Sequence, residues 1–242
     1  MNRMRLDKYL AACGFGSRNE AKKLLKTGVV TVNGDVVRDP ATQLDADTVL
    51  VSVNGEDLRY RQYVYIMLHK PEGVVSATGD RWHDTVLDLL EGNFAEHELF
   101  PVGRLDRDTT GLLLLTDDGA LAHELLSPKK HVDKTYWAQL DMPADAADVA
   151  AFAAGFPLED FITKPAKLLP LEGSAAEVVL TEGKFHQVKR MFEARGKHVL
   201  ALRRTAMGPL TLDEDLTPGD WRELTEEELT ALKNASSSPA RS

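Results

Sequence analysis

The chain has 242 residues, of which 43% are hydrophobic and 28% charged, and its formal net charge at pH 7 is −9. A chain of this length can bury enough apolar surface to fold unaided, as one large domain or two smaller ones. Its single cysteine, Cys13, excludes an intrachain disulfide framework. No apolar run approaches the length of a membrane span, and the polar, basic N-terminus does not resemble a secretory signal. We therefore expect a cytoplasmic protein.

Positive charges gather in two segments although the chain as a whole is acidic. Residues 1–30 contain seven Lys or Arg and two acids, and residues 184–204 contain seven Lys or Arg and one acid. Phosphate groups bind to basic surfaces, so the distribution of charge matters more than its sum. The two basic segments predict an anionic ligand that is bound at defined places on an acidic body.

The first 28 residues predict two short helices. Residues 4–13 place Leu6, Tyr9, Leu10 and Cys13 at helical spacing. Ser17 then offers a side-chain N-cap, and Glu20 stands three residues later, which is the capping-box pattern. We expect a second helix over residues 18–27, closed by Gly28. Its outward-facing side chains are basic: Arg18, Lys22, Lys23 and Lys26.

A compact β unit follows the two helices. Residues 29–32 and 36–37 are apolar and flank Asn33 and Gly34, which is the sequence signal of a type I′ hairpin. Residues 49–53 add another strand. We place the end of this first domain at residue 57, and we assign residues 58–62 to a polar linker.

The first domain, residues 1–57, resembles the S4 RNA-binding domain. Three motifs carry the resemblance: Arg5-Leu6-Asp7-Lys8-Tyr9-Leu10, Ser17-Arg18 and Val30-Thr31-Val32-Asn33-Gly34. It implies that the basic helix pair binds RNA. The candidate RNA contacts are Arg5, Lys8, Arg18, Lys22 and Lys23, together with Arg190 from the second basic segment.

From residue 63 onward, short strands and helices follow one another without regular order. We expect strands over residues 64–68, 112–116, 134–140, 178–180 and 199–204, and helices over residues 85–90, 120–126, 145–154 and 186–195. Such a mixture favours an α+β fold over a doubly wound sheet. We assign residues 63–232 to this larger domain. Residues 233–242 are rich in Ser and Ala and predict a disordered tail.

The segment 103–111 mounts a carboxylate in a loop between two glycines. Gly103 and Gly111 permit a tight backbone path, and the apolar strand that follows fixes where the loop points. Asp106 stands in this loop, two residues after Arg104. Carboxylates that attack sugars or phosphates need a mounting of this kind. The segment therefore carries a candidate catalytic carboxylate.

The larger domain resembles the pseudouridine synthases, and in particular the ribosomal small-subunit branch known as the RsuA type. This resemblance implies a catalytic domain with a mixed, mainly antiparallel sheet. The matching motifs occur in the family's order: His69-Lys70-Pro71 with Gly73, Gly103-Arg104-Leu105-Asp106 with Thr109-Thr110-Gly111-Leu112, Lys134-Thr135-Tyr136, the ten residues from Glu182 to Met191, and Gly208-Pro209-Leu210.

The resemblance implies a role for each of several side chains. Asp106 would act as a nucleophile or as a base at the ribose. A nearby cation must keep it ionised, because burial alone disfavours a charged carboxylate. Lys189 matches the family's basic partner, and Arg190 is the alternative. Tyr136 matches the aromatic that packs against uracil, while Arg104 would fill the gap left by the extruded base or hold its phosphate.

Pseudouridine formation involves no redox change and imports no group, so we expect no cofactor. We also expect no metal, because the histidines lack ligand spacing and there are no paired cysteines. His186 would support its loop rather than transfer a proton.

The resemblance gives one main hypothesis and two alternatives. The main hypothesis is an isomerase that converts one uridine of 16S ribosomal RNA, uridine 516 in this branch, to pseudouridine. One alternative keeps the chemistry but places the target in 23S ribosomal RNA or tRNA. The other is a non-catalytic S4-type RNA-binding assembly protein. The expected partner is structured ribosomal RNA, in free form or within a small-subunit assembly intermediate, and we expect a monomer that does not bind membranes.

Overall fold

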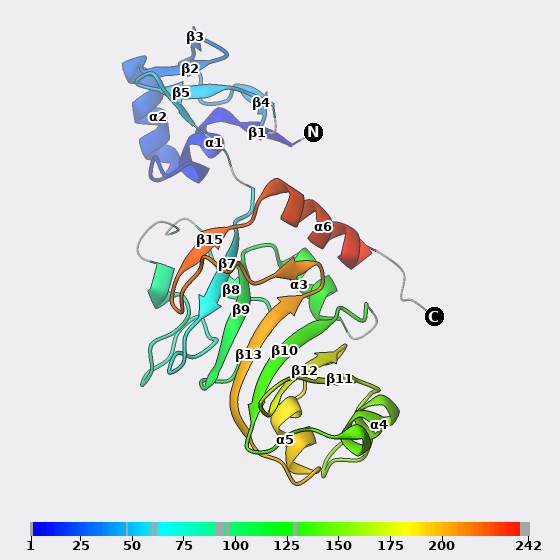
Figure 1. Cartoon of the computed structure of the whole chain (residues 1–242). Coiled ribbons are helices and arrows are strands. Elements are labelled where there is room, and N and C mark those ends of the chain that lie inside the picture. The colour runs from blue at the N-terminus through cyan, green and yellow to red at the C-terminus, as the bar shows by residue number, and fades with distance from the viewer. Residues whose placement is uncertain are drawn as a thin grey trace. The chain divides into compact units, whose positions relative to one another are not determined.

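The computed structural model describes residues 2–46, 48–58, 60, 62–90, 94, 97–127 and 130–237. The chain divides into two compact units, residues 1–63 with 95–97 and residues 64–94 with 98–242 (Figure 1). Each unit has an apolar core of its own, as a domain requires. No helix in the described part of the chain is long and apolar enough to cross a membrane.

The N-terminal unit contains the two predicted helices, α1 (Leu6–Ala12) and α2 (Arg18–Thr27). Ser17 caps α2 by accepting a hydrogen bond from the backbone N–H of Glu20, and the Glu20 side chain accepts one from the backbone of Ser17. Gly28 ends the helix in the left-handed conformation, with φ of 80°. The capping box and the glycine stop are therefore confirmed, and they fix the length of α2.

Small sheets complete this unit. One has the strand order β3-β2-β5-β6, formed by β3 (Asp35–Val36), β2 (Val30–Val32), β5 (Val51–Val53) and β6 (Glu56–Leu58). Asn33 and Gly34 both have positive φ, 51° and 91°, as a type I′ turn requires. A second pairing, β1 (Arg3–Arg5) with β4 (Gln43–Asp45), was not predicted. Residues 59 and 61 of the predicted linker lie outside the described residues.

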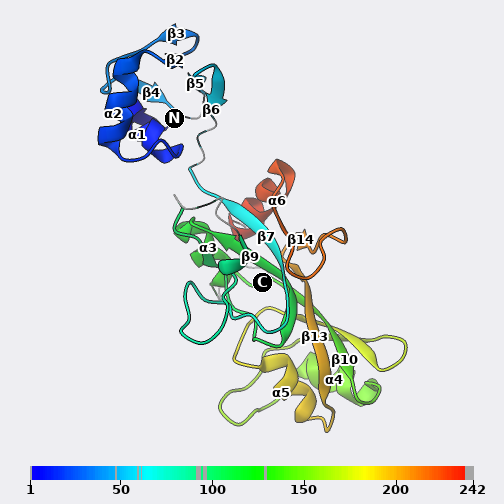
Figure 2. The same cartoon turned by 90° about the vertical axis from the view of Figure 1, so that its left-hand side faces the viewer.

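The larger unit is built on one mixed sheet with the strand order β11-β12-β10-β13-β9-β7-β15, to which β14 and β8 add at β13 and β9 (Figures 1 and 2). Among the described strands only β9 and β13 pair in parallel, so the α+β class and the mainly antiparallel sheet are confirmed. The strands are β7 (Tyr65–Lys70), β8 (Phe100–Pro101), β9 (Thr109–Thr116), β10 (Lys134–Leu140), β11 (Lys167–Pro170), β12 (Ala175–Leu180), β13 (Val199–Met207), β14 (Leu210–Thr211) and β15 (Trp221–Glu223).

Strand β9 is buried on both faces of this sheet. Its side chains alternate, so Leu113 and Leu115 join one core while Leu112 and Leu114 join the other. Helices α4 (Ala146–Ala154) and α5 (Gln187–Glu193) lie at one end of the sheet, and α3 (Gly119–Leu126) and α6 (Glu226–Ser237) lie at the other (Figures 1 and 2). The loop that precedes β9 is thus attached to a rigid, fully covered strand.

Two local expectations are corrected by the structure. Residues 85–90 form no α-helix but a single 3-10 turn, η1 (Asp88–Leu90), and the Asp88 carboxylate accepts hydrogen bonds from both the N–H and the hydroxyl of Thr85. Residues 233–237 belong to α6 rather than to a disordered tail. Leu232 is fully buried, and a helix anchored there continues at low cost. Residues 238–242 lie outside the described residues.

Candidate active site

Asp106 lies in the loop between β8 and β9, and two contacts fix the backbone of this loop. The Asp106 carbonyl accepts a hydrogen bond from the N–H of Thr109 at 3.0 Å. The buried hydroxyl of Ser76 donates to the carbonyl of Leu105 at 2.9 Å and accepts from its N–H at 3.1 Å. The side chain of Asp106 is 28% exposed, so the carboxylate is partly enclosed yet open to a ligand.

Gly111 allows β9 to run beside β13 at this place. Its φ is 102°, and a Cβ at this position would lie 2.2 Å from the carbonyl oxygen of Arg204 and 2.7 Å from its nitrogen. Both contacts are far closer than van der Waals distance, so only glycine permits the backbones to approach in this way. The parallel pairing of β9 with β13, and hence the position of the preceding loop, depends on this residue.

Lys70 lies beneath the loop, and its place in the His69-Lys70-Pro71 motif predicted no role for it in the site. It is fully buried at the end of β7, and its ammonium donates to the carbonyls of Pro71, Arg107 and Thr109 at 2.9, 3.3 and 3.1 Å. Burial lowers the pKa of Lys70 to about 8, although the negative charges of Asp108, Asp106 and Glu72 oppose this shift. A lysine at the end of a strand, followed by proline, indicates a turn, so its burial could not be predicted.

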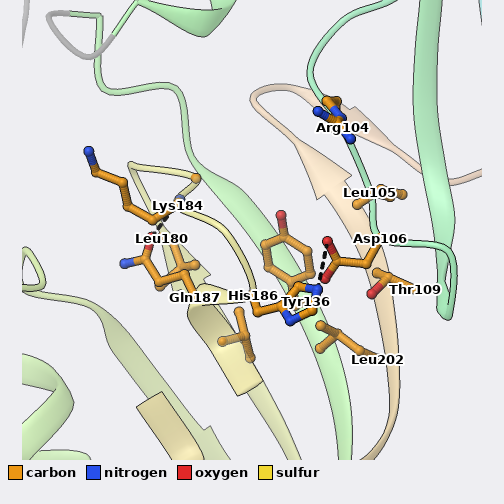
Figure 3. A pocket seen from close by; sticks show the side chains of 12 residues that line it. Arg104, Leu105, Asp106, Thr109, Tyr136, Leu180, Lys184, His186, Gln187 and Leu202 are labelled. Atoms are coloured by element: carbon orange, nitrogen blue, oxygen red, sulfur yellow. Dashed lines mark hydrogen bonds and ion pairs between the residues drawn. The ribbon is translucent and has the colours of Figure 1, made fainter. Parts of the chain in front are cut away.

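Two nitrogen-bearing side chains from the α5 region face the Asp106 carboxylate. Lys189 Nζ lies 3.6 Å from Oδ2. His186 Nε2 lies 3.5 Å from Oδ1 (Figure 3). Lys189 also donates to Asp108 Oδ1 at 2.5 Å. Burial raises the pKa of Asp108, but the hydrogen bond and the charge of Lys189 lower it more, so the net shift is downward. The structure thus brings Lys189 to Asp106 and adds His186, whereas Arg190 pairs with Asp160.

A pocket opens beside this carboxylate, with about 420 Å³ of space between its atoms, part of it continuous with solvent. Tyr136, on β10, presents its ring next to Asp106, and Arg104 is exposed on the loop side (Figure 3). Leu105, Leu180, Val188 and Leu202 supply apolar wall, and Lys184 and Gln187 supply polar wall. A flat ring of moderate size that carries polar edges fits such a lining.

The basic helix residues of the N-terminal unit have a further role. Arg5 and Arg18 both donate to the carboxylate of Asp7, which is fully buried, at 3.0 to 3.2 Å. The side chains of Arg5 and Arg18 remain 40% and 53% exposed. Lys8 and Lys23 are exposed, and Lys22 donates to Asn19 at 3.4 Å. Asp7 therefore orients two of the five RNA contacts predicted in the N-terminal unit and neutralises part of their charge.

The fold and the pocket, with a carboxylate, an aromatic ring and a lysine converging from separate elements, agree with a known class of enzymes. The RNA pseudouridylate synthase family matches residues 64–194, and the S4 domain matches residues 4–50. The chain belongs to the RNA pseudouridylate synthase family and carries an S4 domain at its N-terminal side.

Individual relatives match nearly the whole chain. The RNA pseudouridine synthase YtzG of Bacillus subtilis is 48% identical, over 95% of this chain and 98% of its own. The ribosomal small subunit pseudouridine synthase A of Escherichia coli is 42% identical, over 95% and 100%. A crystal structure described as a pseudouridylate synthase superposes with a TM-score of 0.67 at 38% identity, over 95% of this chain and 99% of that one.

Proposed function

We propose that the chain converts a specific uridine of small-subunit ribosomal RNA to pseudouridine, with Asp106 as the catalytic carboxylate. One observation carries the proposal: the Asp106 carboxylate borders a pocket of mixed lining, with Lys189 Nζ 3.6 Å and His186 Nε2 3.5 Å from its oxygens. Either a nucleophile or a base requires the charged carboxylate, and the Lys189 ammonium supplies the opposite charge beside it. A protein that only binds RNA has no use for a carboxylate facing phosphates.

The reaction itself needs only groups that this chain supplies. The bond between N1 of uracil and C1′ of ribose breaks, the base turns, and C5 bonds to C1′; the proton on C5 leaves and N1 gains one. Asp106 acts at the sugar, as nucleophile or base, and Lys189 holds its charge. Tyr136 packs against the uracil ring. Arg104 either fills the gap that the extruded base leaves in the RNA or binds the phosphate of that nucleotide. These contacts offset part of the free energy that unstacking the base costs.

The partner follows from the S4 domain and from the relatives. The proposed partner is structured RNA, which the S4 domain docks through Arg5, Lys8, Arg18, Lys22 and Lys23, and Arg190 adds a contact near the pocket. The relative of E. coli is named for the ribosomal small subunit, which supports a 16S target over 23S ribosomal RNA or tRNA. Within 16S ribosomal RNA we propose uridine 516 as the target. We further propose that the protein acts as a cytoplasmic monomer, either on free RNA or on a small-subunit assembly intermediate.

Mapping of pseudouridines tests this proposal directly. In cells that lack the gene, one pseudouridine should vanish from 16S ribosomal RNA and return with the intact gene but not with Asp106→Asn, because the amide can neither attack nor accept a proton. Circular dichroism should show that the variant is folded. A mark missing from 23S ribosomal RNA or tRNA would overturn the substrate, and full restoration by Asp106→Asn would overturn the mechanism.

The two-unit structure allows a separate test of RNA docking. Deleting residues 1–57 should weaken binding to structured ribosomal RNA while the larger unit stays folded, because each unit has its own core. Binding measured by filter retention decides the point. Equal affinity with and without the first unit would assign docking to the catalytic unit alone.

A further inference from the structure

An exposed aromatic stack leads from solvent to the catalytic carboxylate. Phe185 is 74% exposed, and its ring stacks on that of His186 with centroids 3.8 Å apart and planes inclined by 18°. His186 in turn directs Nε2 toward Asp106 Oδ1 at 3.5 Å (Figure 3). A phenylalanine ring that is mostly exposed to solvent does not contribute the stabilisation that its burial would give. Such a residue next to a functional pocket indicates a contact surface.

The backbone holds this stack rigidly. Gln187 is almost fully buried; its side-chain NH₂ donates to Glu182 at 2.6 Å, and its side-chain oxygen accepts from the N–H of Lys184 at 3.0 Å. His186 occupies the left-handed region at φ 50°, which costs free energy for a residue other than glycine. The turn from β12 into α5 is thus pinned at both ends, and Phe185 must point outward. A contact surface that is rigid before binding loses little entropy on binding.

Cationic side chains surround a second ring beside this turn. Lys184 Nζ and the guanidinium carbon of Arg190 lie 5.8 and 5.2 Å from the centroid of the Phe161 ring. Arg190 is neutralised by Asp160, whereas Lys184 forms no ion pair within the described residues. Aromatic planes interleaved with cations are the chemistry that binds single-stranded nucleic acid, because bases stack on the rings and phosphates pair with the cations.

We propose that Phe185, backed by His186, is a stacking platform for the base of a nucleotide that flanks the modified uridine, and that Lys184 pairs with a neighbouring phosphate. This inference rests on the proposed function, since it assumes an RNA uridine at Asp106. An extruded uridine leaves its neighbours unstacked at the mouth of the pocket, and the exposed Phe185 ring replaces that lost stacking. A protein partner would use the apolar surface of Phe185 but would not need the adjacent unpaired lysine.

The test uses the full chain and two readouts. The first is the binding of a short, fluorescently labelled oligouridylate by anisotropy, and the second is pseudouridine formation on a 16S ribosomal RNA transcript. Phe185→Ala should weaken oligouridylate binding about fivefold or more and raise KM by a similar factor with kcat nearly unchanged, because one stacking contact is lost. Phe185→Tyr should restore both, since it keeps the ring. Leu169→Ala removes a half-exposed side chain from the edge strand β11 and should change neither.

The outcomes separate the two proposals. If the wild-type protein forms no pseudouridine but Phe185→Ala still weakens oligouridylate binding, the proposed function fails, and what stands is that Phe185 stacks a base of bound RNA. Equal binding by wild type and Phe185→Ala would overturn the platform and assign the exposed ring to a protein partner. Absence of any binding by the wild-type protein, or failure of Phe185→Tyr to rescue a folded protein, would overturn it as well.

Discussion

Lys189 on α5 donates to Asp108, 81 residues earlier in the chain, with 2.5 Å between Nζ and Oδ1. The same nitrogen lies 3.6 Å from Asp106 Oδ2. One ammonium therefore separates two carboxylates of the same loop, which would repel each other without it. The contact also ties α5 to the loop before β9, so the position of the Asp106 carboxylate depends on a helix that is remote in sequence.

Replacing Lys189 by methionine should lower the rate of pseudouridine formation by about 100-fold or more, since it removes the charge that the two carboxylates share. Lys189→Arg should retain more activity because it keeps the charge while changing its geometry. Initial rates on a 16S ribosomal RNA transcript measure both. Lys167→Met, at an exposed position of β11, is the control. A Lys189→Met rate within threefold of wild type would refute the shared-cation arrangement.

Asp108→Asn should show a pH-dependent loss of stability. Burial raises the pKa of Asp108, but Lys189 lowers it more. The pKa of Asp108 therefore lies below its ordinary value of 3.8. A carboxyl group with a lowered pKa in the folded state stabilises the fold above its unfolded pKa and loses this contribution as pH falls through the folded value. The Tm difference between wild type and Asp108→Asn should therefore be present at neutral pH and shrink below pH 3.8. A difference that is constant with pH would contradict the ion pair.

The sequence predicts local signals well and long-range pairing poorly. The capping box at Ser17 and the Asn33-Gly34 turn are set by adjacent residues, and the structure contains both. The motifs named Asp106, Tyr136 and Lys189 as candidate site residues; in the structure Lys189 Nζ lies 3.6 Å from Asp106, and Tyr136 lines the same pocket as Asp106. No local pattern indicates that β15 pairs with β7, more than 140 residues away, because short strands acquire their structure from the neighbours they pack against.

The residues that support the Asp106 loop could not be predicted from local sequence patterns either. The sequence places Lys70 in a turn, although β7 continues through it and every residue of that strand is buried. Of its three carbonyl acceptors, one is the adjacent Pro71, but the other two are Arg107 in the loop and Thr109 at the start of β9, so its role appears only when the fold brings these together. The contact of His186 with Asp106 depends in the same way on a left-handed residue that the sequence does not reveal.

Lys70→Met should destabilise the larger unit by about 2 kcal/mol or more, because buried carbonyls of the Asp106 loop lose their donor. The pH dependence should identify the cause. The pKa of Lys70 is lowered to about 8 from 10.5, so between these values the unfolded chain binds more protons at this amine than the folded chain does. Wild-type stability relative to Lys70→Met should rise across this range. Urea unfolding at several pH values measures it, and a falling or flat difference would show that the amine is not buried.

Gly111→Ala should destabilise the larger unit and abolish activity. The added Cβ would lie 2.2 Å from a backbone carbonyl oxygen that cannot move without breaking the β9–β13 pairing. The positive φ of 102° adds strain for any residue with a side chain, and together these effects should cost about 3 kcal/mol or more. Gly119→Ala is a matched control: it lies at the start of α3 with open space around its Cβ, so the substitution should be neutral or slightly stabilising. Thermal unfolding and initial rates of the two variants decide the point. If the Gly111→Ala protein were as stable and as active as Gly119→Ala, a Cβ would be tolerated at position 111. The close approach of β9 and β13 at this residue would then be refuted.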